Sequence, residues 1–344
     1  MRILNVVLFL VFISYSFIVV VTDKHPFYIP KHFPKPVYQF KDVPQGRLRF
    51  ELGRTLFYDP ALSHDSSISC ATCHLQYTGF THIDHPVSHG IDGRIGNRNS
   101  PVMINLAWNK FFHWDGGVIH LNAQAINPLT HPKEMDMDIV ELLKRLNNSS
   151  FYRKRFYAAF GDSVITTPLL MRGIANFSVA LVSANSKYDK VILKEEGVEF
   201  TNQEKRGYDL FKKYCNACHS EPLFTSHEFK KNGLELDPEL KDLGRMGITA
   251  RRADSLLFKI PTLRNVEFSF PYMHDGRIQK LKEVIEHYSS LPTGNKNVSK
   301  ELKKIKKPFT EEQKKDLLAF LKTLTDKEFL YNKDFSFPKG ELKR

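Results

Sequence analysis

Apolar residues recur every four positions between residues 46 and 58. They are Leu48, Leu52 and Leu56, with charged residues among those between them, and Pro60 follows shortly afterwards. Residues four apart share one face of a helix, and proline does not continue a helix. The pattern therefore predicts a helix over 46–58 that ends before Pro60.

The same periodicity predicts further helices along the chain. These are two short helices within 135–160, one helix from Pro168 to about Lys190, and helices over 202–214, 281–288 and 310–325. The last begins with Thr310-Glu311-Glu312-Gln313, a typical helix-capping pattern. Alternating strand patterns are scarce, so the sequence predicts a mostly α-helical fold in which long loops join the helices.

The N-terminal segment has a different character. Residues 1–22 carry one early positive charge, Arg2, and then an apolar run from Ile3 to Val21. This order is typical of an export signal, so we expect the remainder of the chain to lie in the periplasm. The run is long and lacks a clear cleavage site, which leaves a cleaved signal peptide and an uncleaved membrane anchor both open. The segment 23–45 is rich in proline and predicts an extended arm.

The motif Cys-x-x-Cys-His occurs twice and contains all four cysteines of the chain. It is the attachment signature of c-type haem, in which both thiols bind the porphyrin and the histidine binds iron. Paired cysteines also form zinc sites and redox dithiols, but the histidine after each pair argues against both alternatives. The sequence therefore predicts two covalently bound haem c groups, at Cys70, Cys73 and His74 and at Cys215, Cys218 and His219.

The chain is basic, with a formal net charge of +12 over 344 residues. Lys and Arg are spread along it, and no run of basic residues interleaved with aromatics indicates a nucleic-acid groove. A solvated basic surface is the favoured interpretation. Electrostatic steering of an acidic partner protein is the alternative, and charge alone does not separate the two.

The two halves of the sequence resemble each other. Each has a haem motif, then an Arg-Asn pair, and then an Asp-Gly pair before a predicted helix. This order predicts a duplicated c-type cytochrome domain whose copies are related by a pseudo-twofold axis. We expect an N-terminal haem domain over 46–195 and a C-terminal haem domain over 196–344.

A longer series of motifs, covering roughly residues 45–325, resembles the bacterial di-haem cytochrome c peroxidase and MauG family. The motifs that carry the resemblance are Ser69 to His74, Ser88 to Gly93, Arg98 to Pro101, Trp114 to Gly116, Gln124-Ala125, Asn127-Pro128, Glu134-Met135, Cys215 to His219, Pro261 to Asn265 and Pro271 to Gly276. So many motifs in one fixed order are far more specific than two haem signatures alone.

The resemblance implies a role for several of these residues. His74 would hold the peroxide-binding haem, whose distal pocket would contain Gln124, Pro128 and Glu134. His219 would hold the electron-transfer haem, and Trp114 would stand between the two haems and pass electrons. A calcium ion at the domain interface would be bound by Asn99 and by the backbone carbonyls of Ser269 and Pro271.

Three positions depart from the peroxidase pattern. Ile91 stands where the peroxidases carry a loop histidine that caps the N-terminal haem, and the nearest histidine is His89. Tyr288 stands where they place a methionine as the sixth ligand of the C-terminal haem, as in MauG-type enzymes. Gly117 replaces the arginine often found after Trp-Asp-Gly.

The chemistry of peroxide cleavage fits these residue types. A carboxylate such as Glu134 can take a proton from one peroxide oxygen and return it to the other, and Gln124 can hold the peroxide by a hydrogen bond. Each residue also has an ordinary interpretation. Glu134 could be a helix-start carboxylate, Trp114 a core aromatic, and Asn99 a turn residue. Only the order of the motifs favours the functional roles.

The sixth ligand of the C-terminal haem has four candidates. Tyr288 is the first choice because a phenolate stabilises ferric iron, and the alternatives are Met273, His274 and His287. In the first half, His82, His85 and His89 are expected to be solvent-facing loop residues. Capping of the N-terminal haem by His85 or His89 stays open.

The sequence thus favours an exported di-haem enzyme that reduces hydrogen peroxide to water with electrons from a small cytochrome c or cupredoxin. A MauG-type enzyme that oxidises residues of a partner protein is the closest alternative. A non-catalytic di-haem electron carrier ranks third, because Glu134 and Gln124 beside an open iron would have no use in it. The sequence leaves open whether the chain forms a homodimer.

Overall fold

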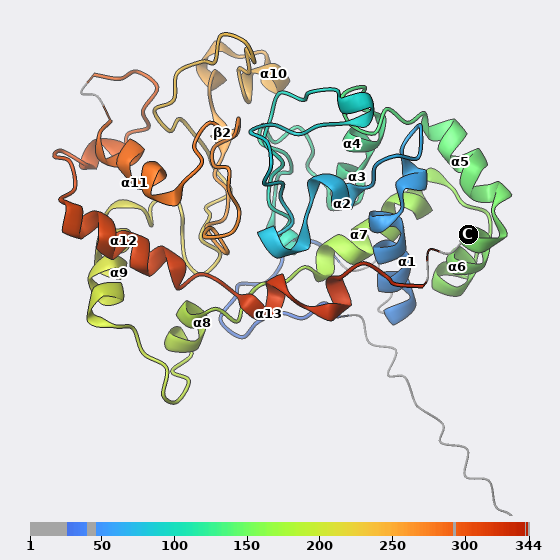
Figure 1. The fold of residues 1–344 in the computed structure, drawn as a ribbon, viewed down its shortest axis with the longest axis horizontal. Helices are drawn as coiled ribbons and strands as arrows, with labels where there is room; N and C mark the ends of the chain where they lie inside the picture. The colour runs from blue at the N-terminus through green and yellow to red at the C-terminus, as the bar shows by residue number, and fades with distance from the viewer. Residues whose placement is uncertain (1–25, 40–45, 292–293, 341, 343–344) are drawn as a thin grey trace, which may run out of the picture.

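The structure, a computed structural model, describes residues 26–39, 46–291, 294–340 and 342. Figure 1 shows two lobes of helices and long loops joined along one seam. Within the described residues, the strands are β1 (Phe229–Lys230) and β2 (Phe258–Lys259), which pair antiparallel, plus isolated bridges. The prediction of a mostly helical fold is confirmed.

The first lobe contains helices α1 to α7 and the second contains α9 to α12. The bounds in the first lobe are α1 (Arg47–Tyr58), α2 (Cys70–Cys73), α3 (Leu121–Gln124), α4 (Ile126–Thr130), α5 (Ile139–Asn148), α6 (Ser150–Phe160) and α7 (Thr167–Ala180). Next come α8 (Lys187–Ile192), α9 (Asn202–Tyr214), α10 (Met246–Thr249), α11 (Leu281–Ser289), α12 (Glu311–Lys322) and α13 (Lys327–Leu330). Helices α8 and α13 lie near the seam (Figure 1).

Helices α1 and α7 cross in the centre of the first lobe. The crossing is close because both helices have glycine at the contact. A Cβ atom at Gly53 would lie 2.4 Å from the carbonyl oxygen of Gly173, and one at Gly173 would lie 2.9 Å from Leu56. The buried rings of Phe50, Phe57 and Phe177 pack around this crossing.

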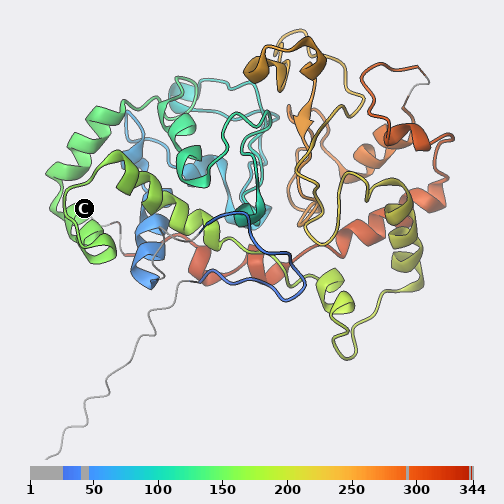
Figure 2. The same ribbon diagram turned by 180° about the vertical axis from the view of Figure 1, so that it is seen from behind.

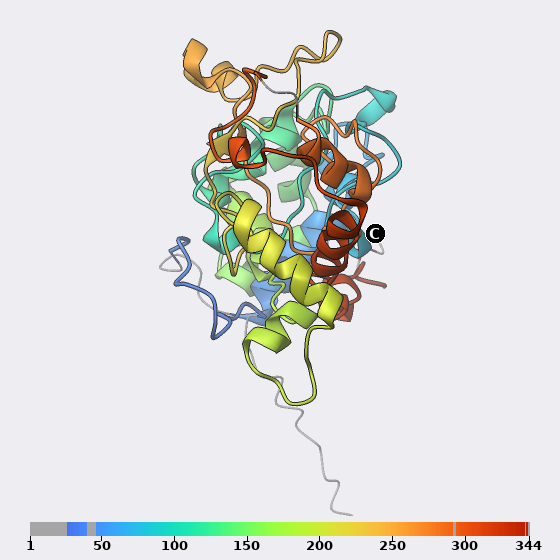
Figure 3. The ribbon, with the colours of Figure 1, turned by 90° about the vertical axis from the view of Figure 1, so that its left-hand side faces the viewer.

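The second lobe repeats this arrangement with α9 and α12, which lie side by side in Figure 3. A Cβ atom at Gly207 of α9 would lie only 1.9 Å from the carbonyl oxygen of Asp316 in α12. Phe211 and Phe320 are buried at the contact, with ring centroids 5.0 Å apart. In each lobe, the helix that precedes the haem motif therefore packs against a later helix of the same lobe.

Most predicted helices are present within one or two residues of their expected bounds. The helix predicted from Pro168 to Lys190 is wrong in extent, because α7 ends at Ala180 and α8 starts only at Lys187. The backbone N–H groups of Ser183, Ala184 and Asn185 bond the side chains of Asn105 and Asp326 instead of helical carbonyls. Tertiary hydrogen bonds thus replace the helical ones across this stretch.

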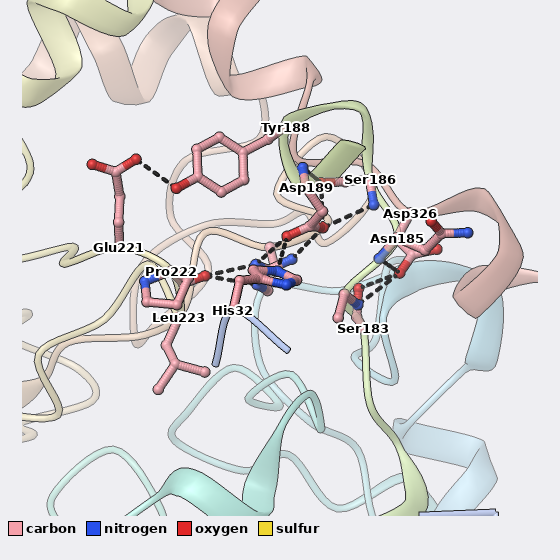
Figure 4. Close-up of polar contacts among 12 residues, drawn as sticks. His32, Ser183, Asn185, Ser186, Tyr188, Asp189, Glu221, Pro222, Leu223 and Asp326 are labelled. Atoms are coloured by element: carbon pink, nitrogen blue, oxygen red, sulfur yellow. Dashed lines mark hydrogen bonds and ion pairs between the residues drawn. The ribbon is translucent and has the colours of Figure 1, made fainter. Parts of the chain in front are cut away.

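The seam is held by a buried ion pair. The guanidinium of Arg264 donates two hydrogen bonds to the carboxylate of Asp189, at 2.7 and 2.8 Å, and both side chains are almost fully buried. His32 donates to the same carboxylate at 2.7 Å, and Ser186 adds a further bond. Figure 4 shows His32 facing Asp189. Burial opposes ionisation of Asp189, but the bonds from Arg264 and His32 outweigh it and hold the pKa far below the usual value.

His32 belongs to the proline-rich segment that was predicted to be an extended arm. Residues 26–39 run across the seam (blue in Figure 2), with irregular backbone and turns. The backbone N–H groups of Val37 and Tyr38 both donate to the carbonyl of Ala107, and Trp108 Nε1 donates to Pro34 O at 2.7 Å. The described part of the arm is therefore bound to the first lobe.

The C-terminal segment crosses from the second lobe back to the first (Figure 1). Phe329, Leu330 and Phe335 belong to the same buried cluster as Phe57 and Phe177. Residues 329–335 thus complete the core of the first lobe.

The predicted export segment 1–22 and part of the arm, 40–45, lie outside the described residues. Among the residues that are described, none of the helices has both the length and the apolar character needed to cross a membrane.

Candidate active site

The first haem motif is folded as one helical turn, α2. The backbone N–H of Ser69 donates to the side chain of Thr72 at 3.1 Å, as part of a capping box that starts the turn. The turn carries the thiols of Cys70 and Cys73, and His74 follows directly. Nδ1 of His74 lies 2.7 Å from the carbonyl oxygen of Phe80, so it carries the proton and leaves Nε2 free.

The second haem motif follows α9 and opens onto a cavity of about 210 Å³ in the second lobe. Cys215, Cys218 and His219 form part of the wall of this cavity. Nδ1 of His219 lies 3.1 Å from the carbonyl oxygen of Pro261 and 3.3 Å from that of Phe224. The free nitrogen is again Nε2.

Burial lowers the pKa of both His74 and His219 to about 4. Both rings are therefore neutral at neutral pH, with one nitrogen satisfied by a backbone carbonyl and one available. A histidine that binds haem iron needs this state. The donor sets thus fit two c-type haems.

The candidate distal residues of the first motif come from α3, α4 and the turn that follows them. Gln124 ends α3, Pro128 lies in α4, and Glu134 lies in the next turn. The backbone N–H of Met135 donates to the carbonyl of Pro128 at 3.1 Å, which folds the turn back onto α4. The backbone of Glu134 also accepts from Ile91 N at 3.0 Å.

Glu134 is not a helix-start carboxylate. Helix α5 begins at Ile139 and is capped by Asp138, whose side chain accepts from the backbone N–H of Glu141. Burial raises the pKa of Glu134 above the usual value. Its charge adds to the effect of burial in raising the pKa of the Cys70 and Cys73 thiols, so the carboxyl group lies near the haem attachment point.

Three of the four candidate sixth ligands line the cavity of the second motif. They are Tyr288, Met273 and His274, whereas His287 is not part of its wall and bonds the backbone carbonyl of Asn232 at 2.8 Å. Burial raises the pKa of Tyr288 far above the usual value, and the Asn232 side chain opposes this by a hydrogen bond to the phenol oxygen. The ring of His274 is stacked on Phe258, with centroids 3.7 Å apart.

The backbone around the two Asp-Gly pairs follows the same course. A bridge joins Phe112 to Val118 in the first lobe and Tyr272 to Ile278 in the second. Within each bridge, one non-glycine residue and the glycine of the pair have positive φ angles: His113 and Gly116, then Met273 and Gly276. Helices α3 and α11 both begin five residues after that glycine.

This correspondence pairs the distal positions of the two lobes. Pro128 lies 12 residues after Gly116, and Tyr288 lies 12 residues after Gly276. The first lobe thus has a side chain without a donor atom where the second has a phenol on the cavity wall. The two candidate haem sites are therefore chemically unequal on this side.

Trp114 lies at the seam and reaches both lobes. Its Nε1 donates to the carbonyl of Asn99 at 2.8 Å, and its own carbonyl accepts from Lys259 N at 2.7 Å. Arg98 links the two lobes next to Trp114. It donates a hydrogen bond to Asp115 of the first lobe and two hydrogen bonds to the carboxylate of Asp242 of the second. Trp114 also lines the cavity of the second motif.

The residues expected to bind calcium also meet at the seam. Asn99 Nδ2 donates to the carbonyl of Pro271 at 2.6 Å, while Asn99 Oδ1 is buried without a hydrogen-bond partner among the described residues. Asn99, Ser269 and Pro271 all line the cavity of the second motif. An unsatisfied amide oxygen beside a backbone carbonyl is the kind of donor set that calcium uses.

The loop histidines differ from the sequence expectation. His82 is buried, with 8% of its surface exposed, so its predicted exposure to solvent is wrong. Its ring stacks on that of His85, which in turn contacts the ring of His89 at 4.0 Å between centroids. Sequence spacing gave no signal for this packing, because it depends on turns within the loop.

The space around Gly117, the third departure, is limited. A Cβ atom there would lie 3.0 Å from the side chain of Ile248 in α10. The neighbouring Arg245 donates to the carbonyl of Asp115 at 3.0 Å and stacks on Phe229. An arginine from the second lobe thus supports this turn, a contact that the sequence analysis missed because Arg245 lies in a loop with no recognisable motif.

Comparisons with known proteins agree with this architecture. The family model for di-haem cytochrome c peroxidase matches residues 47–197. Cytochrome c551 peroxidase of Nitrosomonas europaea is 33% identical over 309 residues, which cover 88% of this chain and 87% of that protein. The methylamine utilization protein MauG of Methylophilus methylotrophus is 36% identical over 289 residues, which cover 79% of this chain and 81% of that protein.

The fold is similar to that of a solved relative. A MauG-like protein associated with microbial copper homeostasis aligns with a TM-score of 0.79 at 32% identity, covering 90% of this chain and 98% of that one.

Proposed function

The chain belongs to the family of di-haem cytochrome c peroxidases and MauG proteins, and from that premise we propose that it reduces hydrogen peroxide to water with electrons from a small redox protein. It is an oxidoreductase of the cytochrome c peroxidase type. Membership implies two c-type haems. His74 would hold the haem at which peroxide binds, and His219 would hold the haem through which electrons enter.

The inequality of the two distal sides carries this proposal. Only the first lobe combines a distal position without a donor atom, Pro128, with a half-buried carboxyl group of raised pKa, Glu134. Peroxide needs an open iron position with a proton-transfer group beside it. The second lobe offers Tyr288 instead, which suits a fully ligated electron-transfer site.

The bound haems supply the iron and the electron storage, and the protein handles protons and orientation. The balanced reaction is hydrogen peroxide plus two electrons and two protons giving two waters. Glu134 takes the proton from the inner peroxide oxygen and returns it to the outer one, so that water leaves. Gln124 orients the peroxide by hydrogen bonding, and His74 holds its ring in one tautomer through Phe80.

Trp114 is proposed as the relay between the two sites. Its place at the seam, its contact with the second cavity and its bonds to Asn99 and Lys259 support this role. The pairs from Arg98 to Asp115 and Asp242 keep the two lobes in register around it.

A MauG-type activity, oxidation of residues in a partner protein, is the alternative. Tyr288 favours it because it follows the MauG pattern, and Ile91 favours it because it departs from the peroxidase pattern. A non-catalytic electron carrier is disfavoured by the half-buried carboxyl group of Glu134, whose pKa is raised.

Steady-state kinetics of the holoprotein test the proposal. We expect hydrogen peroxide to oxidise a reduced c-type cytochrome or cupredoxin, with two donor molecules consumed per peroxide. Cyanide should bind one haem and leave the other unchanged. Peroxide consumption that leaves the donor reduced and instead modifies an added protein would favour the MauG-type alternative. Failure of both haems to bind cyanide would favour the carrier.

Tyr288 is proposed as the sixth ligand of the C-terminal haem. Replacing it with phenylalanine removes the only atom of this side chain that could bind iron. The low-spin ferric signal of that haem should therefore be lost from the optical and EPR spectra. Tyr214→Phe, on the same cavity wall beside Cys215, is the matched control and should leave the signal in place. An unchanged spectrum in the Tyr288 variant would assign the ligand to Met273 or His274.

Calcium is proposed at Asn99, Ser269 and Pro271. Asn99→Ala should lower calcium affinity at least tenfold, measured by titration calorimetry on the chelator-treated holoprotein, because the buried amide oxygen is lost. Magnesium serves as the control ion. Equal calcium binding by both proteins would place the ion elsewhere.

We propose further that the chain works in the periplasm, since haem c is attached outside the cytoplasm. Residues 46–195 and 196–344 are proposed as its two haem domains, related by duplication. The similar backbone around the two Asp-Gly pairs supports this division.

A further inference from the structure

A second, smaller cavity of about 30 Å³ lies at the seam beside Trp114. Its wall includes His113, His227 and Lys259, and none of its thirteen lining residues is Asp or Glu. The wall therefore contains a lysine and two histidines but no carboxylate that could balance the charge of the lysine.

The basic groups in this cavity have no acidic partners. No described residue forms an ion pair or a hydrogen bond with the ammonium group of Lys259. Both ring nitrogens of His227 are buried without a hydrogen-bond partner among the described residues, and so is Nε2 of His113. A buried polar atom without a partner costs free energy, so a cluster of such atoms beside an unpaired ammonium group indicates a missing polar group at this cavity.

The electrostatics of the cluster agree with its geometry. Burial lowers the pKa of Lys259 to about 8. Burial, and then the charges of Lys259 and Lys110, lower the pKa of His227 to about 4. An anion placed among these groups would relieve both effects.

The carboxylate whose charge acts on His113 already has hydrogen-bond partners. Asp115 influences His113, but one of its oxygens accepts from Arg98 and the other from the backbone N–H of Gly117. Among the described residues, Lys259 therefore has no carboxylate as its counter-charge.

The small cavity adjoins the cavity of the second haem motif. Six residues line both: Pro101, Val102, Trp114, Lys259, Pro261 and Thr262. Pro261 also supplies the carbonyl that orients His219. Haem carries two propionate carboxylates, so the cofactor that fills the larger cavity brings an acceptor of the required charge.

We propose that Lys259, with His227 beside it, is the anchoring site for a propionate of the C-terminal haem. The proposal rests on the two haems that the family implies and not on peroxidase activity. Lys259 is a positioning residue: it fixes one edge of the porphyrin, and its backbone N–H holds the carbonyl of Trp114 at 2.7 Å. The same residue thus connects the haem edge to the proposed relay.

The test is Lys259→Met, which keeps the length of the side chain and removes its charge. A cation near a haem disfavours the ferric state, so its loss should lower the midpoint potential of the low-spin haem. We expect a change of at least tenfold in the reduction equilibrium, about 59 mV for one electron, by spectroelectrochemical titration. Lys259→Arg should restore most of the potential, and Lys187→Met, which removes a cation paired with Glu204, is the control.

Resonance Raman spectroscopy gives a second readout, and its first measurement is made on the native holoprotein. In the native holoprotein, the propionate bending mode of the low-spin haem should shift in deuterium oxide, because the carboxylate accepts exchangeable N–H bonds. That shift should decrease in Lys259→Met. An insensitive mode, a potential that changes only for the other haem, or a potential that depends on the buffer anion would each overturn the assignment, whether or not the protein reduces peroxide.

Discussion

Replacing Glu134 with glutamine should lower kcat/KM for peroxide by about 10²–10⁴-fold, the usual contribution of a general acid–base group. Glutamine is close in size but neither accepts nor returns the proton that must move between the peroxide oxygens. Haem attachment should persist, because Glu134 is not part of either attachment motif. Stopped-flow kinetics with peroxide and a reduced donor measure the effect.

The control is Glu141→Gln, a glutamate seven residues later in the first turn of α5. Its activity should match that of the native protein. If both variants lost activity equally, or if neither did, Glu134 would not be the proton-transfer group.

The pH profile gives an independent check on Glu134. The carboxyl group must be ionised to accept a proton, so kcat/KM of the native protein should rise as pH increases through its pKa. Burial raises that pKa, so the rise should lie above the ordinary value of about 4.3 for glutamate. The glutamine variant should lack this part of the profile.

Replacing Asp189 with asparagine should reduce the free energy of unfolding by about 3–5 kcal/mol, because it leaves the buried guanidinium of Arg264 without a counter-charge. The two side chains are 1% and 0% exposed, so water cannot compensate. Urea unfolding of the holoprotein, followed by circular dichroism, measures the change. Acid should also reduce the free energy of unfolding more in the native protein than in the Asp189→Asn variant.

The sign follows from the depressed pKa of Asp189. Its stabilisation is fully present above the unfolded value of about 3.9 and is lost as pH falls through the folded pKa. The difference between the native protein and the variant should therefore shrink below about pH 4. Asp209→Asn removes an exposed carboxylate paired with Lys212 and should cost about 0–1 kcal/mol. Equal losses for the two variants would show that the seam does not depend on this pair.

Local signals predicted the helices well. The capping box at Thr310 and Gln313, and the one at Thr201 and Glu204, each start a helix where the sequence placed it. Such signals are contained in a few neighbouring residues. The interruption between α7 and α8 was not predictable in this way, because Asn105 and Asp326 come from distant parts of the chain.

In the candidate site, too, features set by local spacing were predictable from sequence, and features set by tertiary contacts were not. The haem motifs and the order from Trp114 to Glu134 could be found from sequence, because each depends on spacing along the chain. The cluster of Lys259 and His227 could not be found from sequence, because no motif contains both residues. What they share is a cavity wall without Asp or Glu, which only the structure shows. The burial of His82 also depends on loop packing that no periodicity records.

The return of the C-terminal segment to the first lobe has a consequence for biosynthesis. Under the proposed export, an unfolded chain crosses the membrane from its N-terminus, so Cys70 and Cys73 reach the periplasm before Phe329 and Phe335, which complete the core around Phe57 and Phe177. The first porphyrin would then be attached to a lobe whose interior is still open. The core would close only after residues 329–335 have followed the haem motif across the membrane.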